Sequence, residues 1–127
     1  MQSYLYAAAV VAAIVGLVHS ILGELLIFRK LRKGMIIPDQ PAPPLELRSI
    51  RIIWATWHLA SAFGFGFAAV LAFLASGDLV PDPHITWALV AAFAAGSALV
   101  LVATRGKHPG WVGLLVVAVL IYLGSAA

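Results

Sequence analysis

Long runs of apolar residues, separated by short polar connectors, make up most of this chain. The first run extends from Tyr4 to Phe28, and only His19 and Glu24 interrupt it. At about 1.5 Å per residue it reaches about 37 Å, enough to cross a hydrocarbon core about 30 Å thick with some tilt. No basic segment precedes it and the charges follow it, so we interpret it as a retained span and not as a signal peptide. The runs together predict helical spans at about residues 4–28, 50–75, 85–104 and 109–125.

The connectors carry the residues that break helices. The polar segment 29–49, predicted as a cytoplasmic loop, contains four prolines that rule out a continuous helix, and a helix is expected to restart near Leu45 or Glu46. Pro109 suits the first turn of the last helix, where its missing N–H is not needed. We therefore expect a single transmembrane domain over residues 1–127, folded as an all-α four-helix bundle.

The basic residues all lie at the same side of the predicted spans. The turn between the second and third spans carries Asp78 and Asp82 and no basic residue, whereas all eight Lys and Arg residues belong to the other two connectors or their edges. The positive-inside rule therefore places both basic connectors in the cytoplasm and both termini outside, in a bacterial-type plasma membrane. The basic residues are Arg29, Lys30, Arg32, Lys33, Arg48, Arg51, Arg105 and Lys107.

Composition supports the membrane class. With 63% apolar and 10% charged residues, the chain differs strongly from soluble and from disordered proteins. Cysteine is absent, which excludes thiolate ligands and disulfide chemistry within this chain. The net charge of +3 is explained by membrane topology, so nucleic acid is not expected as a partner.

Small residues recur at every fourth position in three of the spans. Because lipid gives helices no hydrophobic reason to associate, close approach along such stripes supplies packing energy. A stripe not used inside the bundle could form a homo-oligomer or bind a larger membrane complex. The stripes are Ala8, Ala12, Gly16 and Ser20; Thr56, Ala60, Gly64, Ala68 and Ala72; and Ala88, Ala92 and Gly96.

Ionisable side chains inside apolar spans cost a few kcal/mol to insert, so each one needs a partner or a use. On a helical wheel they share faces with small and aromatic residues, and counting from the basic anchors places them in the cytoplasmic half of the membrane. We predict a substrate or proton site that opens toward the cytoplasm and contains His19, Ser20, Glu24, Arg51, Trp54 and His58. Its mouth is predicted to contain Arg48, Arg105, Lys107 and His108.

Four interpretations of this site remain open. In the first, the polar groups only fix helix register, with Glu24 paired to Arg51 or Arg48. In the second, the protein is a small transporter or channel, in which Glu24 titrates and His19 and His58 relay protons or bind substrate. In the third, it is an accessory or assembly subunit of a larger membrane complex. In the fourth, it is a redox protein whose His19, His58 and Glu24 hold haem or a divalent metal.

The sequence does not favour an enzyme. Its serines lack the context of a nucleophile elbow, and no Ser-His-Asp set can be named from spacing alone. No HExxH or paired Glu-x-x-His motif supports a metal centre, so a cofactor is expected only if the haem or metal interpretation holds.

Overall fold

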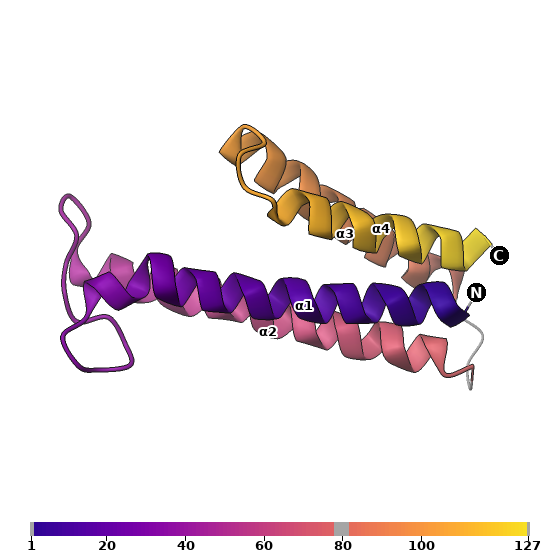
Figure 1. Ribbon diagram of the computed structural model, residues 1–127, viewed down its shortest axis with the longest axis horizontal. Coiled ribbons are helices and arrows are strands. Elements are labelled where there is room, and N and C mark those ends of the chain that lie inside the picture. The colour runs from indigo at the N-terminus through magenta and orange to yellow at the C-terminus, as the bar shows by residue number, and fades with distance from the viewer. Residues whose placement is uncertain (1, 78–81, 127) are drawn as a thin grey trace. The chain divides into compact units, whose positions relative to one another are not determined.

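The computed structural model describes residues 2–77 and 82–126. Within these ranges the chain forms four α-helices and one short 3-10 helix, and its β-structure is limited to an isolated bridge between Ala42 and Leu45. The prediction of an all-helical protein is therefore confirmed. The elements, labelled in part in Figure 1, are α1 (Gln2–Leu26), η1 (Phe28–Leu31), α2 (Leu47–Ala75), α3 (Pro83–Thr104) and α4 (Gly110–Ala126).

In the described part of the chain, three helices are long and apolar enough to cross a membrane: α1, α2 and α3. The fourth, α4, is equally apolar in character but has 17 residues. At the usual rise this is about 25 Å, slightly less than a typical hydrocarbon core. Length and composition therefore indicate a membrane protein, and the four-span arrangement stays a prediction.

Two helix boundaries around the first connector differ from the predicted spans. α1 ends at Leu26 instead of Phe28, because the chain turns at Ile27 into η1, where Phe28 is almost fully buried. α2 begins at Leu47, ahead of the apolar run that starts at Ile50. This start lies close to Leu45 or Glu46, where the connector sequence predicts that the helix restarts.

The ends of α3 and α4 show how capping sets a boundary. α3 begins at Pro83 because the Asp82 side chain accepts a hydrogen bond from the His84 backbone N–H at 2.7 Å, which satisfies one free donor of the first turn. α4 begins at Gly110, so Pro109 precedes the helix, where its carbonyl accepts from Val112 N at 3.0 Å. Asp78, the other acidic residue of the predicted outer turn, lies outside the described residues.

The described residues belong to two compact units. The first, called the apolar unit, comprises residues 1–15 and 64–127, and the second, called the polar unit, comprises Gly16–Phe63. Each contains part of α1 and part of α2. The single transmembrane domain over residues 1–127 stays a prediction.

The apolar unit has a core of buried residues contributed by all four helices. Leu5, Leu71, Val117 and Ile121 are at most 1% exposed and belong to this cluster. Gly124 of α4 lies so close to α1 that a Cβ there would meet Leu5 at 3.1 Å. Small residues thus allow close approach here, as Ala8 and Ala12 also show by their burial, whereas Ala88 and Ala92 of α3 are exposed.

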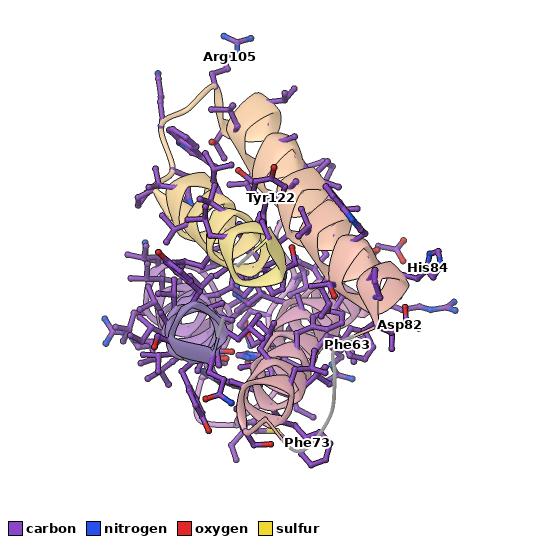
Figure 2. All side chains as sticks on the ribbon, turned by 90° about the vertical axis from the view of Figure 1, so that its right-hand side faces the viewer. Phe63, Phe73, Asp82, His84, Arg105 and Tyr122 are labelled. Carbon is purple, nitrogen blue, oxygen red and sulfur yellow. The ribbon has the colours of Figure 1, made fainter. Side chains whose placement is uncertain are left out.

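The two ends of α3 differ in charge. Figure 2 labels Asp82 and His84 at one end of the helix and Arg105 at the other. Arg105 adopts a left-handed conformation (φ 52°), and Gly106 N donates to Leu101 O at 2.8 Å, so the helix ends in a Schellman-type cap. The helix therefore separates an acidic end from a basic one along its own axis.

Candidate functional site

The polar unit is organised around one carboxylate. Trp54 donates its indole N–H to Glu24 Oε1 at 2.8 Å, and His58 Nε2 lies 2.9 Å from the same oxygen. The other carboxylate oxygen, Oε2, forms an ion pair with the guanidinium of Arg32. Glu24 thus has partners on α2 and on the connector that follows α1, and charge-assisted bonds of this kind are the strong ones.

Helical spacing explains why these groups meet. Ser20 and Glu24 are one turn apart on α1, and Trp54, His58 and Ser61 follow one another at about one-turn intervals on α2. Two facing stripes are thereby aligned over about two helical turns. Trp54 and His58 also contact each other edge to face, with ring centroids 5.1 Å apart.

A row of hydrogen bonds continues from Glu24 away from the connector. Beyond His58, its Nδ1 atom lies 3.0 Å from Ser20 Oγ, and Ser20 Oγ donates to Ser61 Oγ at 2.8 Å. Ser61 is 3% exposed, so the row ends at a buried hydroxyl. Glu24, His58, Ser20 and Ser61 are therefore joined in sequence from a carboxylate to the interior of the helix pair.

The direction of these bonds depends on the charge of His58. When Ser20 donates to Ser61, it accepts from His58 Nδ1–H. If Glu24 is ionised, the Nε2 atom that faces it then also carries a proton, and the ring is an imidazolium. When His58 is neutral with its proton on Nε2, Nδ1 accepts from Ser20, and the Ser20 hydroxyl turns away from Ser61. Protonation of His58 and rotation of the Ser20 hydroxyl are thus coupled.

Trp57 holds the two helices in register beside this row. Its indole N–H donates to the backbone carbonyl of His19 at 3.0 Å, and its ring stacks on the His19 imidazole with centroids 4.3 Å apart and an interplanar angle of 8°. A Cβ on Gly23 would overlap the indole, so only glycine fits there. Phe28 meets Trp57 edge to face at 5.8 Å. These contacts fix the angle at which Glu24 and His58 face each other.

An open pocket exposes the carboxylate end of the row. It has a volume of about 530 Å³ and combines the ionisable groups of the site with an indole and the apolar side chains of the connector. Its lining consists of Glu24, Arg32, Gly34, Met35, Ile36, Trp54 and His58. Ser20 and Ser61 are not part of that lining, so the pocket meets the row at Glu24 and His58.

The predicted arginine partners of Glu24 lie elsewhere. Arg51 donates from Nε to the Pro38 carbonyl at 3.2 Å, and it lines a second pocket of about 630 Å³ together with Arg48. Arg48 and Arg51 of α2 therefore line that second pocket, and Arg51 also binds the connector backbone. The cation that pairs with Glu24 is Arg32, which belongs to the connector. The other predicted mouth residues, Arg105, Lys107 and His108, belong to the apolar unit, and their place in the site stays a prediction.

Ser20, His58 and Glu24 form a hydroxyl–imidazole–carboxylate line that the sequence spacing did not reveal. The line does not open a nucleophile to substrate, because Ser20 already bonds to Ser61 and lies outside the pocket lining. A hydrolase also needs donors that bind an oxyanion, and the backbone around Ser20 is helical, so its N–H groups are already used. The arrangement suits proton movement better than acyl transfer.

The described residues contain no group of three His, Cys, Asp or Glu side chains placed to hold a metal. Of the three predicted ligands, Glu24 and His58 meet, whereas the His19 ring stacks on Trp57. For the metal or haem interpretation, the described residues therefore supply two ligand groups that contact each other, Glu24 and His58.

Two residues that contact this row, Arg32 and Ser61, were not in the predicted site. Arg32 was assigned only to the cytoplasmic connector, and no periodic pattern relates a loop residue to a helix face. Ser61 could have been found, because it is one turn from His58 and therefore on the same face as Trp54. A helical wheel of α2 that included hydroxyl residues as well as ionisable ones would have placed Ser61 on the face of the site.

The fold and the site define an all-helical protein with three helices of membrane-spanning length and a polar row between two of them. Comparison with known proteins adds no relative: no family model, no curated protein and no solved structure matches the chain.

Proposed function

We propose that this chain is a small multi-pass transporter or channel-like protein of a bacterial-type plasma membrane, in which Glu24 and His58 exchange protons with the cytoplasm. The observation that carries the proposal is the unbroken row from the pocket carboxylate through His58 and Ser20 to Ser61. An ionisable group inside a spanning helix is by default a candidate functional site, and proton relays built from Glu and His are among its known uses.

The proposed topology supports this role. In a four-helix bundle with both termini outside, the connector between α1 and α2 lies in the cytoplasm, and so does the pocket beside Arg32. Protons reach Glu24 and His58 through this open pocket. The coupled rotation of the Ser20 hydroxyl then passes the change to Ser61, which needs no movement of the helices.

The topology can be tested on a clean background, because the natural chain has no cysteine. Single cysteines at Lys30, Lys107 and Ser125 are reacted with a membrane-impermeant maleimide in intact cells. Labelling of Ser125→Cys with protection of Lys30→Cys and Lys107→Cys is expected for four spans. Protection of all three would mean that α4 does not cross, which contradicts the proposed arrangement.

Proton movement is tested in proteoliposomes that contain a pH-sensitive dye. With a potential imposed by potassium and valinomycin, the wild type is expected to admit protons, and Glu24→Gln and His58→Gln are expected to reduce the rate at least about tenfold, as for loss of a proton-transfer group. Glu46→Gln and His84→Gln are matched controls, because both side chains are exposed and lie outside the row.

Equal rates in Glu24→Gln and Glu46→Gln would contradict the proposal. Absence of flux in the wild type, in preparations whose circular dichroism shows folded helix, would also contradict it. In that case the site would act as a structural clamp between α1 and α2, since the same bonds fix helix register.

A further inference from the structure

The Glu24 carboxylate already binds a cation that the protein itself supplies. Arg32 follows η1 in the connector, and its guanidinium pairs with Glu24 while donating to the Ile36 carbonyl. The Arg32 side chain is 18% exposed and the Glu24 side chain 26% exposed, so the pair stands at the edge of the open pocket. A ligand with the same charge and planar shape could take the position of Arg32.

The rest of the pocket is suited to the body of such a ligand. The Trp54 indole is fixed by its bond to Glu24, and Met35 and Ile36 are 63% and 79% exposed beside it. An aromatic ring next to a carboxylate favours a cation with an apolar body, by stacking and by attraction of the charge to the ring face. An anion would have to approach the Glu24 carboxylate, which makes it the poorer fit.

From this geometry we propose that the pocket binds an organic cation with a planar amidinium or guanidinium head, which replaces Arg32 on Glu24. The inference rests on the proposed function and names its substrate class. Because one carboxylate serves both, a proton on Glu24 and a cation on Glu24 exclude each other. Arg32 then acts as a tethered competitor that occupies the carboxylate when neither ligand nor proton does.

The test is calorimetric titration of the purified full chain in detergent with benzamidine, which is cationic at neutral pH, and with benzamide as its uncharged counterpart. The wild type is expected to bind benzamidine and not benzamide. Arg32→Ala is expected to bind benzamidine about fivefold more tightly, because a partly exposed ion pair is worth at most about 1 kcal/mol. Glu24→Gln is expected to bind it at least about tenfold more weakly.

Lys30→Ala is the matched control for Arg32→Ala, since Lys30 lies in η1, is exposed and carries the same charge. It should bind benzamidine like the wild type. If Arg32→Ala loses helical content, Arg32→Gln replaces it and is expected to show the same tighter binding. Unchanged affinity in the folded Arg32 variant, equal affinity in Glu24→Gln, or equal binding of benzamide would overturn the proposal.

The outcome is separable from that of the flux experiment. Binding that depends on Glu24 and Arg32, without proton flux in liposomes, supports the cation site and removes the proton-transport function. Proton flux that depends on Glu24, without benzamidine binding to any variant, supports transport and overturns the substrate class.

Discussion

The polar and apolar units use the same secondary structure but hold their helices together by different means. In the polar unit, α1 and α2 are joined by side-chain bonds at Glu24, Ser20 and Trp57. In the apolar unit, the core is built from Leu, Val, Ile and Ala, and the α3–α4 pair has a single described side-chain bond between its helices, from Ser97 Oγ to the Trp111 carbonyl at 2.8 Å.

The difference separates packing from function. Bonds between transmembrane helices average well under about 1 kcal/mol each, so helices can pair without them. The apolar unit shows that this chain does so. The row from Glu24 to Ser61 is therefore not required for helices of this chain to associate, and this supports the proposed role in proton movement.

Removing the central carboxylate should have the largest effect on stability. Glu24→Ala leaves Trp54, His58 and Arg32 without their acceptor, and we expect a loss of about 2–3 kcal/mol in the free energy of unfolding, since bonds to charged groups are worth about 1.5–3 kcal/mol. The measurement is SDS-induced unfolding in mixed micelles. Glu46→Ala, at an exposed position, should change it by less than about 0.5 kcal/mol. Equal losses in the two variants would show that the bonds to Glu24 do not stabilise the polar unit.

The second comparison uses two glycines. Gly23→Ala would drive a methyl group into the Trp57 indole and should cost about 2 kcal/mol, as overpacking does. A Cβ on Gly66 would meet nothing within 4 Å, so Gly66→Ala should gain about 0.5 kcal/mol from higher helix propensity. Opposite signs in the same unfolding assay support the close approach at Trp57. A neutral Gly23→Ala would show that the indole is free to move.

The sequence determines some features of this structure and leaves others open. Long apolar runs determine the helices, and helical spacing grouped Ser20 with Glu24 on α1 and Trp54 with His58 on α2, but it did not show that the two faces contact each other. The pairing with Arg32 was missed because it depends on the path of the connector, which proline positions restrict without specifying. α1 ends at Leu26, two residues before the end of the predicted span, because Phe28 leaves the helix to pack against Trp57, a contact that hydropathy does not encode.

Two buried serines allow a packing role to be distinguished from a role in proton movement. Ser61 is 3% exposed and belongs to the row, whereas Ser97 is 4% exposed and bonds to a backbone carbonyl. Each Ser→Ala change should cost about 1 kcal/mol in stability. In liposomes, however, Ser61→Ala should slow proton flux severalfold, while Ser97→Ala should leave the rate per folded protein unchanged. Equal flux rates in the two variants would show that proton movement does not require Ser61 and that the functional part of the row stops at Ser20.

The smallest expected effect concerns the end of α3. Arg105 has a positive φ of 52°, a conformation that costs a side-chain-bearing residue about 1 kcal/mol and glycine almost nothing. Arg105→Gly relieves that strain but adds freedom to the unfolded chain, so the net gain should be about 0.5 kcal/mol. The sequence predicted Arg105 at the mouth of the site, and benzamidine titration of the same variant tests that prediction. An altered affinity would assign Arg105 to the mouth, and an unchanged affinity would remove it from the site.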